Sequence, residues 1–458
     1  MRTGLLGYLL RNGVWAGGGR IATALAVFLA NVLLARMLPP AGYGGYFVAL
    51  GLVTVLSSLG ILGLDQTAVR LVAVARARRG AVAKLAGRLL GLAAVGGLLV
   101  AGLLMALRGP ILDRLLDSAA LLTAGGFLAL WILASVLQIV VAEIFRGLHD
   151  IRLASLLGGL RRAGVAQAVL LLAGLAVYRE LGISTLRPVI ALAAAVSLVV
   201  ALAGGGLLAA RLAAAPTRGD GLSTPSYRQI VTVAWPFLGA TLLLTARTNG
   251  DSLVLAALSG ADEVALYGAA VRLIAVLLIP HLVVGAVLPP LVADLHERGR
   301  RVDLERTVRL GATAAAAPTT LLFAALLIFG PAVLGALFGD YYRLAFPALV
   351  LLLGGHMAGV LAGPNAVVLA MTGHQRLLMA AMAASAIWVL GLGALLAPRH
   401  GAAGLAAAAA SGLLLQNLLA VAFVRRRVGL WTTALASPRQ IRAALAGLAP
   451  ARAEGEGA

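Results

Sequence analysis

The sequence has no cysteine and very little charge. Only 12% of its 458 residues are Asp, Glu, Lys or Arg, whereas 61% are hydrophobic. A soluble protein typically carries about 25% charged and about 45–50% apolar residues. The lack of cysteine excludes disulfides and thiolate metal sites. The lack of charge excludes an aqueous surface around most of the chain, so we expect lipid to be its main solvent.

Acidic residues are scarce as well. There are 17 of them against 37 basic residues, of which Lys84 is the one lysine, and the formal net charge is +20. A charge of this sign can indicate a nucleic-acid partner. Here the basic residues fall in short connections between apolar runs rather than on a polar domain. We therefore expect the chain to contact the lipid bilayer and no nucleic acid.

Long apolar runs occupy most of the remaining sequence. A helix needs about 20 predominantly apolar residues to cross a bilayer. By this criterion the sequence predicts twelve spans, at residues 14–35, 46–64, 89–107, 120–142, 163–178, 189–210, 230–257, 266–288, 311–336, 346–370, 378–397 and 403–424. The start, MRTGLLGYLLRNG, lacks the cleavage pattern of a signal peptide, so we expect no cleaved leader.

The basic residues set the expected orientation, because cytoplasmic loops of membrane proteins carry an excess of arginine and lysine. With the N-terminus inside, 27 basic residues fall in inner connections and 7 in outer ones. Three remain within spans, namely Arg20, Arg247 and Arg272. The sequence therefore predicts an all-α, multi-pass plasma-membrane protein with both termini in the cytoplasm.

The two halves of the chain resemble each other in sequence. LLARMLPPAGYGGYFVALGLVTVL (33–56) and LVLAALSGADEVALYGAAVRLIAVL (253–277) align when Tyr46 is superposed on Tyr267. Because each half has six spans, both enter the membrane in the same sense, as a parallel repeat with a cavity between the halves. We predict an N-terminal six-helix bundle, a cytoplasmic linker, a C-terminal six-helix bundle and a basic cytoplasmic tail, at 1–210, 211–229, 230–424 and 425–458 respectively.

Five segments carry a resemblance to a known family. They are LLARMLPPAGYGGYFVAL (33–50), GILGLDQTAVRLVA (60–73), ALYGAAVRLIAVLLIPHLVVGAVLPPLVADL (265–295), VVLAMTGHQRLLM (367–379) and LLAPRHGAAGLAAAAA (395–410). In order and spacing they resemble the oligosaccharide (O-antigen or exopolysaccharide) repeat-unit flippases of the multidrug/oligosaccharidyl-lipid/polysaccharide (MOP) exporter superfamily. The peptidoglycan-precursor branch of that superfamily usually carries two extra C-terminal helices, so twelve spans favour the polysaccharide branch.

The resemblance implies a fold and an activity. The fold is a V of two pseudo-symmetric six-helix bundles. The activity is the flipping of polyprenyl-pyrophosphate-linked oligosaccharides from the inner to the outer leaflet of a bacterial or archaeal plasma membrane, by alternating access, for cell-surface polysaccharide synthesis. The implied partners are that lipid-linked substrate, a polysaccharide polymerase and a chain-length regulator, and we expect neither a cofactor nor a metal.

Charged residues within the spans are the candidate binding residues. A charge at the bilayer centre costs about 2.5–3.5 kcal/mol on insertion scales, so it normally faces a cavity or a partner. An arginine fork suits the oxygens of a pyrophosphate. We therefore interpret Arg20, Arg247, Arg272 and Asn31, which shares a helix face with Arg20, as the lining of a cationic cavity. The alternative is that the long arginine side chains reach the headgroups from span ends.

Three acidic residues are candidates for protonation or cation coupling. Asp251 lies four residues after Arg247, hence on the same helix face. The two either neutralise each other so that the helix can insert, or Asp251 is the coupling site and Arg272, at a similar depth, completes an Arg–Asp–Arg cluster. Asp65 and Glu143 are the other candidates, with an interfacial position at a span end as the alternative for both.

Two other functions compete with the flippase. A cation-coupled multidrug or metabolite antiporter on the same fold would need acidic residues in the N-terminal bundle and few cations in the cavity. A membrane glycan polymerase or ligase would need a long outer loop with catalytic side chains, and the predicted outer loops are all short. The three in-span arginines favour an anionic substrate, and the sequence predicts a transporter rather than an enzyme.

Overall fold

The computed structural model describes residues 21–77, 82–116, 118–159, 162–214 and 224–434. A first helix covers Ile21–Met37. The elements after it are α2 (Pro40–Gly60), α3 (Leu64–Ala77), α4 (Val82–Ala106), η1 (Gly109–Leu115), α5 (Ala119–Thr123), α6 (Gly125–Gly147), α7 (Ile151–Leu157), β1 (Gly158–Gly159), β2 (Arg162–Ala163), α8 (Val165–Glu180), α9 (Leu186–Ala213), α10 (Tyr227–Ser259), α11 (Ala261–Leu277), α12 (Ile279–Glu297), α13 (Arg301–Phe338), η2 (Asp340–Ala345), α14 (Phe346–Ala362), α15 (Asn365–Met371) and α16 (Gln375–Arg427).

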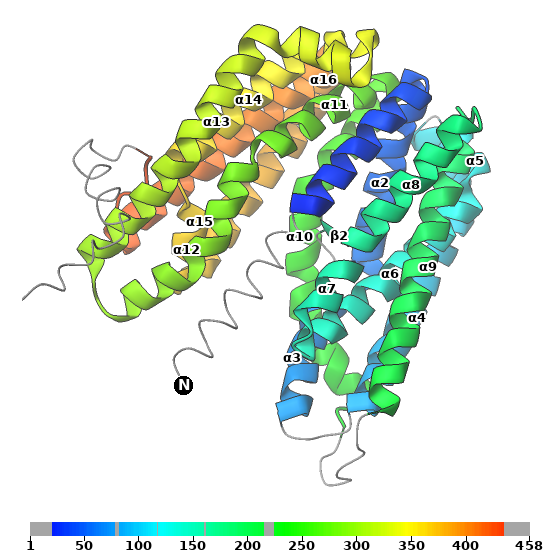
Figure 1. Cartoon of the computed structure of the whole chain (residues 1–458), viewed down its shortest axis with the longest axis horizontal. Coiled ribbons are helices and arrows are strands. Elements are labelled where there is room, and N and C mark those ends of the chain that lie inside the picture. The colour runs from blue at the N-terminus through cyan, green and yellow to red at the C-terminus, as the bar shows by residue number, and fades with distance from the viewer. Residues whose placement is uncertain (1–20, 78–81, 117, 160–161, 215–223, 435–458) are drawn as a thin grey trace, which may run out of the picture.

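The helices form the two arms of a V (Figure 1). One arm holds α2 to α9 and the other holds α11 to α16. The arms meet at the end that carries the turn between α10 and α11, which we call the closed end. They diverge toward the end that carries the turn between α12 and α13, which we call the open end. The predicted all-α, V-shaped, two-bundle fold is confirmed, apart from the two-residue pair β1–β2.

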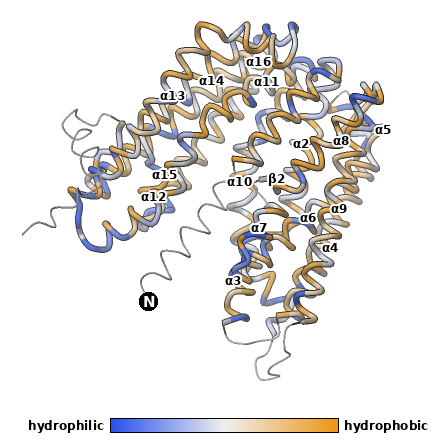
Figure 2. The backbone as a smooth tube through the Cα atoms, in the orientation of Figure 1, coloured by the Kyte–Doolittle hydropathy of each residue, from blue (hydrophilic) through white to orange (hydrophobic). Residues whose placement is uncertain are grey.

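Eight of the described helices are long and apolar enough to cross a membrane by length and composition. Figure 2 shows hydrophobic residues along the arms and a strongly hydrophilic turn between α12 and α13. One of the eight, α16, covers two predicted spans, and the remaining three predicted spans fall on the first helix, on α8 and on the pair α11–α12. The chain is thus a multi-pass membrane protein, and each predicted span lies mostly on helix within the described part.

Several predicted spans are not the simple helices that hydropathy suggests. The span at 266–288 is divided between α11 and α12, and Pro280 stands at the start of α12. Proline lacks the N–H that a helix interior needs. The span at 346–370 is likewise broken at Gly363 and Pro364, between α14 and α15. Helix α16 covers the last two predicted spans, and its interruption at Gly401, where φ is 52° and ψ is −132°, lies between their predicted bounds.

The buried core explains why the arms stay together at one end. The largest core cluster draws residues from both halves, among them Tyr43 and Phe47 of α2 and Ala265 and Tyr267 of α11. Two smaller clusters each lie within one arm toward the open end. Apolar burial therefore joins the halves at the closed end and stabilises each arm separately beyond it.

Helix α10 packs against both arms. Near its start, Ile230 and Ala234 belong to the core of the first arm. Near its end, the Ser259 hydroxyl donates to the carbonyl oxygen of Ala397 on α16, at 2.8 Å. The predicted division places residues 230–424 in one C-terminal bundle; that division remains a prediction, and α10 is the helix that connects the two parts.

The repeat predicted from the tyrosines agrees with the helix boundaries. Helix α2 begins at Pro40 and α11 begins at Ala261, and the superposition of Tyr46 on Tyr267 places these two starting residues opposite each other. The two helices also contact each other at the closed end. The candidate site lies at this contact.

Candidate functional site

Helices α2 and α11 cross at very close range. A Cβ on Gly44 would lie 1.7 Å from the carbonyl oxygen of Ala261 and 3.1 Å from the backbone nitrogen of Ala265. In the alignment of Tyr46 with Tyr267, Ala265 is the counterpart of Gly44. A contact between equivalent positions is what a two-fold or pseudo-two-fold interface produces at its axis. The crossing of α2 and α11 therefore marks the pseudo-symmetry axis of the molecule.

Further contacts between the halves surround this crossing. The Arg36 guanidinium at the end of the first helix donates through Nε to the carbonyl oxygen of Leu337 at 2.7 Å and through a terminal nitrogen to that of Ala336. Cationic side chains stabilise the last carbonyls of a helix in this way. The rings of Tyr43 and Tyr342 meet edge to face with centroids 5.6 Å apart. These contacts hold the closed end shut.

Arg272 of α11 lies at this junction. Its Cζ is 5.0 Å from the centroid of the Phe47 ring on α2. The Nε atom is buried and has no hydrogen-bond partner within the described structure. No ion pair of Arg272 occurs among the described residues either. A half-buried guanidinium without an ion-pair partner among the described residues suits an anionic ligand, because its buried Nε–H remains to be satisfied.

Asp251 of α10 is held within the second half. The hydroxyl of Tyr267 donates to its Oδ2 at 2.6 Å, and the backbone N–H of Ser252 donates to its Oδ1 at 2.8 Å. The predicted contact between Arg272 and Asp251 is not formed in this conformation, because Arg272 lies over Phe47 and Tyr267 takes the carboxylate. The backbone of Arg247 belongs to α10, but its side chain lies outside the described part, so its pairing with Asp251 stays a prediction.

The other predicted cavity residues lie on the first helix or before it. Arg20 lies outside the described residues. Asn31 is 3% exposed, and its amide nitrogen donates to the carbonyl oxygen of Val27 at 2.7 Å. Its Oδ1 accepts from the hydroxyl of Tyr43 at 3.5 Å. In this conformation the Asn31 side chain is therefore engaged by the protein, and its contact with substrate remains a prediction.

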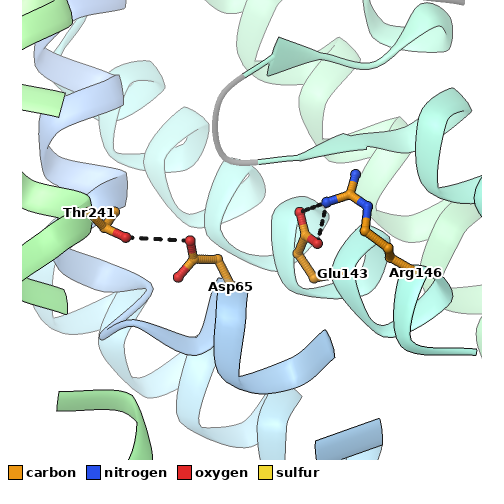
Figure 3. A network of polar contacts seen from close by, with 4 residues as sticks. All are labelled: Asp65, Glu143, Arg146 and Thr241. Atoms are coloured by element: carbon orange, nitrogen blue, oxygen red, sulfur yellow. Dashed lines mark hydrogen bonds and ion pairs between the residues drawn. The ribbon is translucent and has the colours of Figure 1, made fainter. Parts of the chain in front are cut away.

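Asp65 and Glu143 are both buried in the first arm (Figure 3). Asp65, in the first turn of α3, is 2% exposed and accepts from the hydroxyl of Thr241 on α10 at 3.4 Å. Glu143, on α6, is 4% exposed and pairs with Arg146 at 2.5 Å. Both carboxylates have polar partners, and Asp65 in addition joins the first half of the chain to α10.

The turn before Asp65 explains this position. Residues Leu62 and Gly63 have φ values of 55° and 77° and redirect the chain from α2 into α3. A Cβ on Gly63 would lie 2.2 Å from the carbonyl oxygen of Ala234. Glycine therefore permits both the left-handed turn and the close approach of α10. Thr241 lies two turns after Ala234, on the same face of α10, and so reaches Asp65.

We expect Thr241→Val to lower the free energy of unfolding by about 1 kcal/mol, because a buried carboxylate loses a hydroxyl donor while the side-chain shape is kept. Thr232→Val is the matched control, since the exposed Thr232 hydroxyl donates to the carbonyl of Arg228 within the same helix. Thermal unfolding of both variants in detergent checks this. Equal stability of the two variants would mean that the contact between Asp65 and Thr241 contributes nothing.

Sequence reasoning missed the partners of the charged residues. Phe47 and Gly44 carry no charge and were not singled out, although the alignment of Tyr46 with Tyr267 also places Phe47 opposite Gly268. A large residue in one half opposite a glycine in the other is the signal that could have identified a contact on the axis. Nothing in the sequence marks Arg36 as a contact of α13.

Known proteins resemble this chain in sequence and in fold. Residues 9–296 match the family model described as polysaccharide biosynthesis protein. A search of curated proteins finds no significant match.

Among solved structures, an inward-facing multidrug resistance MATE family transporter of the MOP superfamily aligns with a TM-score of 0.66 at 15% identity, over 89% of this chain and 94% of that one. The lipid II flippase MurJ, in an inward closed conformation, aligns with a TM-score of 0.66 at 10% identity, over 90% and 87%. A MOP superfamily transporter from Pyrococcus furiosus, noted for the reverse polarity of its binding pocket, aligns with a TM-score of 0.58 at 15% identity, over 92% and 95%. The chain therefore has the fold of MOP superfamily transporters.

Proposed function

This chain belongs to the polysaccharide biosynthesis protein family, and from that premise we propose that it flips polyprenyl-pyrophosphate-linked oligosaccharides across the plasma membrane. The proposed step moves the charged headgroup and its sugars from the inner to the outer leaflet. Alternating access between the two arms would supply the pathway, as in other transporters built from two repeats.

The observation that carries the proposal is the state of Arg272. Its guanidinium lies at the junction of the halves, over an aromatic ring and without an ion-pair partner among the described residues. A charge in the membrane that is not neutralised by the protein normally serves a substrate or an ion. A pyrophosphate offers the paired oxygens that a guanidinium binds with two parallel hydrogen bonds.

The predicted sidedness fits this direction of transport. Arginines cluster near the open end, at the turn between α12 and α13 and at the end of α16, where Arg298, Arg300 and Arg425 are found. Basic connections favour the cytoplasmic side. We place the open end in the cytoplasm, so that this conformation would admit a substrate made there. The cytoplasmic position of both termini, predicted from the basic residues, is part of this proposal.

The rival on the same fold is a cation-coupled antiporter for drugs or metabolites. This function is the alternative because one of the structures with a similar fold is a multidrug resistance transporter. A cationic drug would be repelled by the guanidinium of Arg272, which has no ion-pair partner in the described part of the chain, because like charges in a medium of low dielectric constant cost several kcal/mol. The charge at the junction therefore favours the lipid-linked anion.

The proposal is tested in cells from which the protein is depleted. Lipid-linked oligosaccharide is expected to accumulate on the cytoplasmic side while surface polysaccharide falls, and the unmodified gene should restore both. Normal surface polysaccharide with no accumulated lipid-linked oligosaccharide would refute a flippase role. Altered drug resistance in such cells would support the antiporter instead.

Asp251→Asn is expected to remove the pH dependence of transport if Asp251 is the coupling residue, because an amide cannot exchange a proton in this range. Tyr267→Phe is the matched control, since it removes the donor to Oδ2 and leaves the carboxyl in place. Transport rates from about pH 6 to pH 8 check this. If the Asp251→Asn protein keeps the pH profile of the unmodified protein, Asp251 is not the coupling residue and its role is structural.

A further inference from the structure

Phe47 contacts Arg272 from the opposite half of the chain. The guanidinium carbon of Arg272 lies 5.0 Å from the centroid of the ring. A guanidinium within about 6 Å of an aromatic centroid is attracted to the negative face of the ring. Phe47 is 8% exposed, so the protein and not solvent surrounds the ring. The contact with Phe47 therefore fixes the orientation of the guanidinium on the side that faces the ring.

The ring itself is held in position by a glycine. A Cβ on Gly268 would lie 2.6 Å from Cε2 and 2.8 Å from Cδ2 of Phe47. Gly268 precedes Arg272 by four residues, so both lie on the same face of α11. The ring therefore occupies the space above Gly268 and supports the arginine one turn further along. The Tyr43 ring meets Phe47 edge to face, with centroids 5.1 Å apart, and packs it from α2 itself.

The repeat makes this arrangement asymmetric. In the alignment of the two halves, the counterpart of Phe47 is Gly268, and the counterpart of Arg272 is Gly51. Two phenylalanines could not share the space on the axis, because a Cβ alone would already overlap the ring. One half thus contributes the ring and the other contributes the glycine and the cation. The junction contains a single cation–ring pair among the described residues of α2 and α11.

We propose that Phe47 is a positioning residue that orients the Arg272 guanidinium for the pyrophosphate of the substrate. This inference rests on the proposed function and adds the residue that organises its anion site. Because the ring and the cation belong to opposite halves, the site is complete only while α2 and α11 remain in contact. When the halves separate at the closed end, the ring moves away from Arg272. The affinity for the anion is then lower on the side from which the anion is released.

The test is a binding titration with farnesyl pyrophosphate, a short polyprenyl pyrophosphate, on the full-length chain in lipid nanodiscs. Phe47→Leu keeps an apolar side chain but removes the ring, and we expect binding about tenfold weaker. Gly268→Ala should weaken binding in the same way, because the new methyl group displaces the ring. Gly102→Ala is the matched control, since a Cβ there meets nothing within 4 Å.

A double-mutant cycle separates positioning from general packing. If Phe47 acts through Arg272, then Phe47→Leu causes no further loss of binding once Arg272→Gln is present. An equal loss in both backgrounds would overturn the inference, as would unchanged binding by folded Phe47→Leu and Gly268→Ala proteins. Size-exclusion chromatography and thermal unfolding establish that each variant is folded.

The outcomes also distinguish the inference from the proposed function. Binding that Arg272→Gln abolishes and Phe47→Leu leaves unchanged would refute the positioning role alone. Binding that is absent from the unmodified chain, or insensitive to Arg272→Gln, would refute the anion site and the inference with it.

Discussion

Arg272→Gln is expected to reduce transport by about 100-fold or more while leaving the protein at least as stable as before. Losing one partner of a desolvated charge pair costs about 2–5 kcal/mol, and about 2.7 kcal/mol corresponds to a factor of 100. The expected effect on stability has the opposite sign. A charge inside the membrane costs about 2.5–3.5 kcal/mol on insertion scales, whereas a cation–π contact contributes only about 0.5–2 kcal/mol of stabilisation. Glutamine removes both, so folding should not suffer.

The control for this prediction is Arg298→Gln. Arg298 is an exposed residue at the open end, where it pairs with Asp294 at 2.8 Å. Such exposed pairs contribute about 0–1 kcal/mol, so transport and stability should both stay near the unmodified level. Arg272→Lys should be intermediate, because it keeps the charge but loses the planar fork. Full transport by Arg272→Gln would show that Arg272 does not form an anion site for the substrate.

Gly44→Ala is expected to have the largest effect on the closed end. The added methyl group would lie 1.7 Å from the carbonyl oxygen of Ala261, and the obstacle is backbone that cannot turn away. Helix α2 must therefore withdraw from α11, which also separates Phe47 from Arg272. Overpacking of this kind costs about 1–3 kcal/mol. We expect a lower unfolding temperature together with greater exposure of the closed end.

The absence of cysteine makes this exposure measurable with a single reporter. Ala35, which is 6% exposed near the end of the first helix, is a suitable position for a cysteine. A membrane-impermeant maleimide should label Ala35→Cys faster when Gly44→Ala is also present. Gly42→Ala is the matched control, because a Cβ there would meet its nearest neighbours at an ordinary 3.4 Å. Equal labelling with and without Gly44→Ala would show that the crossing does not hold the closed end.

The sequence predicted the architecture well because the bilayer constrains it strongly. Backbone groups in lipid must be satisfied within helices, so apolar runs report spans directly. The alignment of Tyr46 with Tyr267 also predicted the register between the halves, which the starts of α2 and α11 reproduce. The interruption at Gly401 falls in the gap between the predicted spans 378–397 and 403–424. An average over a window of about 20 residues does not locate a break within a span, so the division of 266–288 into α11 and α12 is seen only in the structure.

The candidate site was predicted only in part, since hydropathy identifies buried charges but not their neighbours. Arg272 was singled out by its cost in the membrane. Its partner Phe47 is separated from it by most of the first half and by the linker, and no local pattern connects the two. The predicted pairing with Asp251 relied on depth alone. Depth does not determine which face of a helix a side chain occupies, and Tyr267 proved to be the residue on that face.

Reconstitution of the purified chain into liposomes tests the central claim most directly. A labelled polyprenyl-pyrophosphate oligosaccharide is placed in both leaflets, and a glycosidase added outside removes sugars only from the outer one. The account predicts that the unmodified chain makes nearly all of the sugar accessible, and that Arg272→Gln leaves about half protected. Protection of half of the sugar by the unmodified chain, in liposomes where the same protein exchanges a cationic drug for protons, would contradict it.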